Sequence, residues 1–243
     1  MKNLVIFAAV IALAACNDGR TDLDRAKEAA DYTDRARAIG FYQLHLEDNP
    51  DDFDARLEYT LLLGENWAFE GGDAGPILES LEVLFVEQPE NLRVKELYAM
   101  MLVRQAQAAQ EARRYGETEE LLLQASDVHP DVGTASYHLG VLYGELDRGD
   151  EAFAALISAA LKRPQIPDLY LQLGREYLAR EMIDRAVNTL LLVDELRGTS
   201  TYLIPQANCA LAEAYLKRGD ESAARARRDS AHPECSVPGL DAE

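Results

Sequence analysis

A repeat of 34 residues is the feature that most constrains how this chain can fold. One pattern of residue types returns after that interval: Leu139-Gly140, Tyr143 and Ala152 recur as Leu173-Gly174, Tyr177 and Ala186. A period of this length is typical of stacked helical hairpins, in which each hairpin buries its apolar face against its neighbours. The sequence therefore predicts an all-α protein with extended stacking of hairpins.

The other units fit the repeat less closely. A third unit carries Leu211-Ala212 and Tyr215, but Tyr177 and Tyr215 are 38 residues apart, which places four extra residues in the connection near Thr201 to Ile204. Upstream, the apolar spacing predicts one long first helix from Asn91 to Arg114, then a helix from Glu117 to Val128. Two helices are expected before these, from Thr21 to Ala30 and from Thr33 to Glu47, with a further hairpin in between. About six hairpins account for residues 21–235.

The pattern of Leu-Gly, Tyr and Ala resembles the tetratricopeptide repeat. The resemblance implies a right-handed superhelical solenoid whose first helices line a concave groove that binds a protein or peptide. It places eight residues in that groove: Thr134, Tyr137, Val141 and Gly144 in one unit, and Asp168, Leu171, Arg175 and Leu178 in the next. They mix apolar and polar side chains, as a peptide groove does. For each of them the alternative is that it packs only against the next helix.

The first residues are typical of an export signal. Met1-Lys2-Asn3 precedes an apolar run from Leu4 to Ala15, which is too short to span a bilayer. Leu13-Ala14-Ala15-Cys16 resembles the lipobox of bacterial lipoproteins. The resemblance implies a signal peptide at residues 1–15, lipidation of Cys16, a linker at residues 16–20 and a membrane anchor on the periplasmic side. The alternative is an ordinary secretory signal with a chance cysteine. Asn17, in place of the aspartate associated with inner-membrane retention, favours the outer membrane.

Cys209 and Cys235 remain as an even pair of cysteines in an oxidising compartment. Cys209 falls in the first turn of the last hairpin, and Cys235 follows its second helix, so an antiparallel hairpin brings them close together. We expect a disulfide, and the alternative is two unpaired thiols. Residues 236–243, rich in small residues and proline, are expected to form a flexible tail.

The net charge of −19 makes nucleic acid and anionic lipid headgroups poor partners, because the field of the protein repels them. The alternative is that the acidic residues only keep the protein soluble. The four histidines, His45, His129, His138 and His232, show no metal-ligand spacing. Gly71-Gly72-Asp73-Ala74-Gly75 lacks the Gly-Lys-Ser/Thr of a phosphate-binding loop and is interpreted as a turn. We therefore expect no cofactor, no metal, no small-molecule substrate and no enzymatic activity.

A lipid anchor followed by tetratricopeptide repeats resembles the pilotin-like lipoproteins of type IV pili and the corresponding lipoproteins of Flp/Tad pili. The resemblance implies a scaffold that binds a protein partner and helps an envelope complex, such as a pilus or secretion machine, to assemble or localise. The alternative is an adaptor that regulates peptidoglycan hydrolases or synthases.

Overall fold

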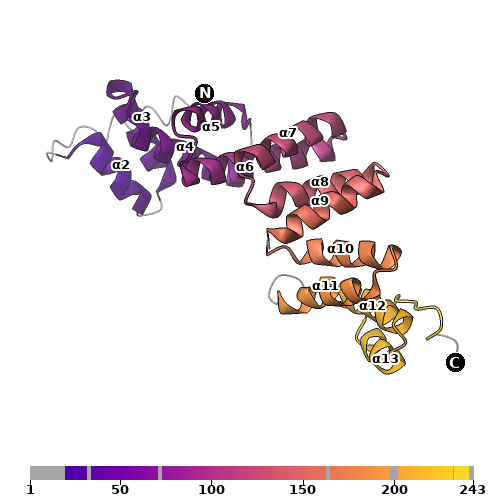
Figure 1. Cartoon of the computed structure of the whole chain (residues 1–243). Coiled ribbons are helices and arrows are strands. Elements are labelled where there is room, and N and C mark those ends of the chain that lie inside the picture. Colours follow the sequence, from indigo (N-terminus) through magenta and orange to yellow (C-terminus); the bar gives the residue numbers. More distant parts are fainter. Residues whose placement is uncertain are drawn as a thin grey trace. The chain divides into compact units, whose positions relative to one another are not determined.

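The computed structural model describes residues 20–31, 34–70, 73–162, 165–196, 202–231 and 233–240. The described residues form twelve helices and no strand, which confirms the all-α prediction (Figure 1). The chain divides into two compact units, residues 1–108 and 109–243, where the sequence suggested a single solenoid. The predicted signal peptide and Cys16 lie outside the described residues.

The first unit contains α2 (Asp22–Asp31), α3 (Arg35–Asp48), α4 (Phe53–Glu70), α5 (Gly75–Glu87) and most of α6 (Leu92–Glu111). The side chain of Asp34 accepts a hydrogen bond from the Arg37 N–H and caps the first turn of α3. Phe41 and Tyr42 of α3 are buried against α2 and α4. Helix α6 has 20 residues and corresponds to the long helix predicted from Asn91 to Arg114.

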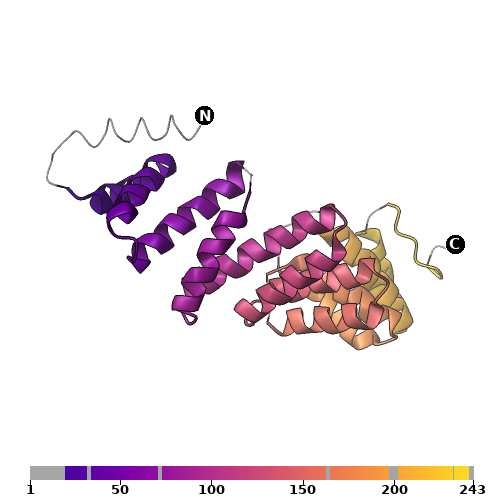
Figure 2. The same cartoon turned by 90° about the horizontal axis from the view of Figure 1, so that it is seen from above.

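The second unit consists of the end of α6 and seven further helices. These are α7 (Tyr115–Val128), α8 (Gly133–Glu145), α9 (Gly149–Leu161), α10 (Pro167–Ala179), α11 (Ile183–Glu195), α12 (Leu203–Lys217) and α13 (Glu221–Asp229). The hairpins α8–α9, α10–α11 and α12–α13 stack in chain order (Figures 1 and 2). Leu156, Leu169, Leu190 and Leu211 belong to one core shared by the stacked helices.

The turns that end α6, α8, α10 and α12 have the same backbone conformation. Arg113, Asp147 and Glu181 have φ angles of 57°, 56° and 57°, and Gly219 has a φ of 85°. In each case the N–H of the following residue donates to the carbonyl five residues earlier, as Arg148 does to Tyr143 at 2.9 Å. This is the Schellman ending of a helix, which satisfies carbonyls that the helix leaves open. The turns follow one another at 34, 34 and 38 residues, so the repeat of turn geometry begins between α6 and α7, where the side-chain pattern is weaker.

The predicted small positions lie where two helices cross closely. A Cβ atom built on Gly140 would lie 2.7 Å from Leu156 Cδ2, and one built on Gly174 would lie 2.5 Å from Leu190 Cδ2 and Cγ. Both leucines are buried in the core, with 2% and 0% of their surface exposed. A side chain at either position requires the facing leucine, or the helix that carries it, to shift.

The C-terminal segment packs against the last hairpin. Cys209 and Cys235 form the expected disulfide, with their Cα atoms 5.7 Å apart. Val237 and Leu240 are buried, at 2% and 9% exposure, against α12 and α13. The expectation of a flexible tail is therefore wrong for residues 236–240, because two apolar side chains next to the disulfide find a surface to cover.

Repeat positions show which surface the C-terminal segment covers. By the 38-residue offset, Cys209 and Leu216 of α12 correspond to Leu171 and Leu178 of α10. In α10 these positions belong to the core shared with the next first helix, α12. On α12, residues 235–240 pack against Cys209 and Leu216. The segment thus covers on α12 the positions that α12 covers on α10.

We predict that Gly174→Leu lowers the free energy of unfolding by about 1 to 3 kcal/mol, because the added side chain overlaps Leu190 and forces α10 away from α11. Thermal and denaturant unfolding of the purified variant measure the effect. Gly144→Leu is the matched control, since a Cβ there meets no atom within 4 Å and leucine favours a helix more than glycine does. Equal stability of the two variants would show that the assigned crossing is wrong.

We predict that Cys235→Ser lowers the free energy of unfolding by roughly 3 kcal/mol, the chain-entropy value for a bridge between residues 26 apart. Denaturant unfolding in the absence of reductant measures the effect. Cys209→Ser gives the same loss, and the double variant adds little to either single one, because one bond is removed in all three. Two free thiols counted in the unreduced, denatured wild type would contradict the pairing.

Candidate functional site

The first helices of the second unit form a continuous surface that we call the first-helix face. Within α10, Asp168, Gln172 and Arg175 are spaced at i, i+4 and i+7, which places them on one side of the helix. The face comprises side chains of α8, α10 and α12: Thr134, Tyr137, Val141, Asp168, Gln172, Arg175 and Gln206. Arg175 is exposed and the other six are half-buried.

Hydrogen bonds join these side chains from one hairpin to the next. The Tyr137 hydroxyl donates to Asp168 Oδ2 at 2.6 Å, and Gln172 Nε2 donates to the same oxygen at 2.5 Å. Further along, Arg175 Nη2 donates to Gln206 Oε1 at 3.2 Å. The side chains on the face are therefore held in fixed positions before any partner arrives, which lowers the entropic cost of binding.

Burial and charge set the protonation of two side chains at the α8 end of the face. Burial, together with the hydrogen bond to Asp168 and its negative charge, raises the pKa of Tyr137. The phenol therefore remains a proton donor to Asp168 at neutral pH. Burial lowers the pKa of His138, whose ring centroid lies 5.0 Å from that of Tyr137. His138 is neutral at pH 7, so Asp168 and Arg175 carry the charges of the face.

The structure corrects two of the predicted groove residues. Leu171 and Leu178 have only 1% and 5% of their surface exposed and belong to the apolar core. They cannot contact a partner, because the packing of α10 against α12 covers them. The predicted residues Thr134, Tyr137, Val141, Asp168 and Arg175 remain partly or fully exposed on the first helices.

Gln172 and Gln206 belong to the face, although the repeat positions did not identify them. Both contacts between neighbouring first helices join residues 31 apart, Tyr137 with Asp168 and Arg175 with Gln206. A search for polar residues at this spacing would have found the second pair. The repeat pattern describes positions within one unit, so it does not show which side chains of adjacent units contact each other.

The chemistry of this face is that of recognition by polar and aromatic contacts. It presents a carboxylate, a guanidinium, two amides and a phenol, with Val141 and Thr134 adding apolar surface. Among the described residues no group of three or more His, Cys, Asp or Glu side chains is placed to hold a metal ion. No helix within the described ranges is long and apolar enough to cross a membrane.

These features define an all-α solenoid of the tetratricopeptide type. The structure is similar to that of BtubC from P. vanneervenii, with 17% sequence identity and a TM-score of 0.52, over 82% of this chain and 87% of that one. It is also similar to PilF of Pseudomonas aeruginosa, with 14% identity and a TM-score of 0.52, over 85% of this chain and 86% of that one.

A structure of MamA matches with 18% identity and a TM-score of 0.48, over 72% of this chain and 89% of that one. No protein-family model matches the sequence, and no curated protein matches it. At these identities the structural similarity shows the fold alone.

Proposed function

We propose that this protein is a lipid-anchored scaffold on the periplasmic side of the envelope, which binds a protein partner through its first-helix face. The observation that carries the proposal is two hydrogen-bonded groups on this face, one formed by Tyr137, Asp168 and Gln172 and the other by Arg175 and Gln206. A polar surface that is fixed in position and still open to solvent suits recognition of an extended or helical segment.

The composition of the face agrees with a binding role. Tyrosine and arginine are the side chains that most often dominate the energy of protein interfaces, and Tyr137 and Arg175 are partly or fully exposed here. The charges of Asp168 and Arg175 fix the orientation of a partner more than they add affinity. We propose no catalytic role, cofactor, nucleic-acid partner or small-molecule substrate.

Two observations support a role in assembling or localising an envelope complex such as a pilus or secretion machine. The lipobox resemblance at Cys16 favours anchoring, with the outer membrane preferred because Asn17 follows the cysteine. The fold shared with PilF of Pseudomonas aeruginosa agrees with the pilus version but does not by itself choose it over other envelope machines.

We predict that Tyr137→Phe combined with Arg175→Ala reduces recovery of the partner by about tenfold or more, since two hot-spot side chains are altered. Crosslinking of the full-length protein in cells, purification and mass spectrometry measure recovery. Arg225→Ala is the matched control, because Arg225 is an exposed arginine on the second helix α13, where it pairs with Glu221. Unchanged recovery in the double variant would rule out the first-helix face as the binding surface. Recovery of peptidoglycan hydrolases or synthases would favour the adaptor role instead.

We predict that Cys16→Ser moves the protein from the membrane fraction to the soluble periplasmic fraction, because the thiol that accepts the lipid is lost. Cell fractionation and the mass of the mature N-terminus measure the change. Cys209→Ser is the control and leaves the protein on the membrane. A Cys16→Ser protein that is processed normally and stays membrane-bound would overturn the lipid anchor.

A further inference from the structure

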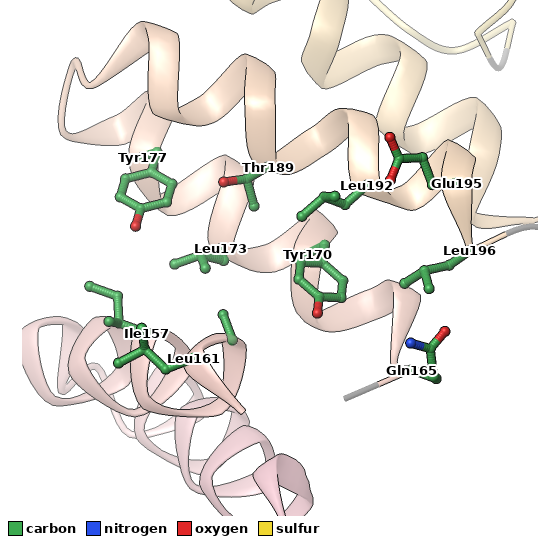
Figure 3. Close-up of a pocket in the computed structure, with 11 residues that line it drawn as sticks. Ile157, Leu161, Gln165, Tyr170, Leu173, Tyr177, Thr189, Leu192, Glu195 and Leu196 are labelled. Carbon is green, nitrogen blue, oxygen red and sulfur yellow. The ribbon is translucent and has the colours of Figure 1, made fainter. Parts of the chain in front are cut away.

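A pocket of about 500 Å³ lies in the second unit between α9, α10 and α11 (Figure 3). Ile157 and Leu161 of α9, Leu173 of α10, and Leu192 with the adjoining Leu196 from α11 give it a mainly apolar lining. Pockets of roughly 300 to 1,000 Å³ with apolar walls and a few polar groups are typical binding sites. This pocket has that character, with Tyr170, Tyr177 and Thr189 supplying hydroxyl groups.

The pocket opens on the side of α10 away from the first-helix face. Tyr170, Leu173 and Tyr177 are spaced at i, i+3 and i+7 and share one side of the helix. At 100° per residue, that side lies nearly opposite the side that carries Asp168, Gln172 and Arg175. A ligand in the pocket and a ligand on the first-helix face therefore do not compete for the same side chains.

The neighbouring units line the equivalent space with polar side chains, and in the unit after it is a pocket of about 490 Å³. In the unit before, the positions of Tyr170, Leu192 and Leu196 are occupied by Ser136, Ser158 and Lys162. There Lys162 Nζ donates to Ser136 Oγ at 3.2 Å, and the hydroxyls of Ser136 and Ser158 are 3.5 Å apart.

In the unit after, Asn208 and Ser230 stand at the positions of Tyr170 and Leu192. Asn208 Nδ2 donates to the Ser230 carbonyl at 3.1 Å. The α10–α11 hairpin, which lies between these two units, replaces the polar contact with leucines. The fold does not require leucine at these positions, because its neighbours pack in the same manner with serine, lysine and asparagine.

The leucines at the mouth of the pocket are exposed to solvent. Leu161 has 79% of its surface exposed and Leu192 has 36%. The exposed carboxylate of Glu195 is the charged side chain in the described lining, and no described residue forms a hydrogen bond or ion pair with it. The pocket thus combines exposed apolar surface with one negative charge that is not paired by any residue the structure describes, in a chain whose net charge of −19 attracts cations.

We propose that this pocket is a second docking site, which takes apolar side chains of a partner polypeptide that carries a lysine or arginine within about one helical turn. The leucines bury the apolar side chains and Glu195 pairs with the cation. A fatty acid or an anionic lipid suits the pocket less well, because its headgroup would meet the Glu195 carboxylate. This proposal rests on the proposed scaffold function in one respect, which is that the ligand of the pocket is a polypeptide.

The first experiment places a photo-crosslinking amino acid at Leu161, at the mouth of the pocket, in the full chain in cells. A parallel strain carries it at Arg175 on the first-helix face. Mass spectrometry then identifies the crosslinked segments. The expected result at Leu161 is a segment with clustered apolar residues and a nearby lysine or arginine.

The second experiment measures binding of a synthetic peptide with the sequence of that segment to the purified protein. The double variant Leu192→Ser, Leu196→Lys gives the pocket the residues of the preceding unit. We expect it to weaken binding by about tenfold or more, because two leucine contacts with the partner are lost. Glu195→Lys weakens binding as well. Glu120→Lys, an equal charge change at an exposed site on α7, is the matched control and leaves binding unchanged.

Several outcomes would overturn the pocket as a polypeptide site. One is equal affinity of the peptide for the wild type and both pocket variants. Another is the absence of any crosslink at Leu161. A third is that the wild type binds the fluorescent fatty acid cis-parinaric acid and the double variant does not. A crosslink at Arg175 with none at Leu161 leaves the proposed scaffold function standing while this inference fails. If the double variant melts at a lower temperature, Glu195→Lys, which changes only an exposed side chain, still decides the matter.

Discussion

The close crossing of the two helices inside each hairpin is the constraint on which the second unit depends. At Gly174 even a single Cβ atom would overlap Leu190, so α10 and α11 approach until backbone meets side chain. The same contact recurs between Gly140 and Leu156. Because the hairpins share one crossing geometry, their first helices stack with the same side outward. Side chains 31 residues apart therefore meet, and the hydrogen bonds of the first-helix face follow from this register.

The hairpin turns show that backbone geometry is kept where side chains vary. Arg113, Asp147 and Glu181 adopt the left-handed conformation that only Gly219 adopts without strain. Each of the three costs about 1 to 2 kcal/mol relative to a right-handed conformation. The hydrogen bonds of the Schellman ending and the packing of the following helix offset that cost. A repeat can thus lose its recognisable side chains, as it does around the turn between α6 and α7, and still keep the turn itself.

The sequence predicted the fold and the register of the hairpins because the 34-residue spacing locates the glycines at which the two helices of a hairpin cross. It predicted less of the candidate site. Leu171 and Leu178 occupy groove positions by their number in the repeat, but the stacking of α12 on α10 buries them. Whether a side chain at a groove position is exposed to solvent depends on how tightly the next unit packs against it. The identity of the residue does not reveal this. Composition also suggested a mobile tail, whereas the burial of Val237 and Leu240 depends on α12 and α13.

A first helix in the interior of a stack has neighbours on two sides and two narrower sides left over. In α10 one of these presents Asp168, Gln172 and Arg175, and the other forms the floor of the pocket with Tyr170, Leu173 and Tyr177. The neighbouring units line the second side with serine, lysine and asparagine, which form hydrogen bonds within the protein and need no partner. Replacing those bonds with leucine removes polar contacts and exposes apolar surface to water. An arrangement that is costly in the free protein, and unnecessary for the fold, is best explained by a partner that covers it.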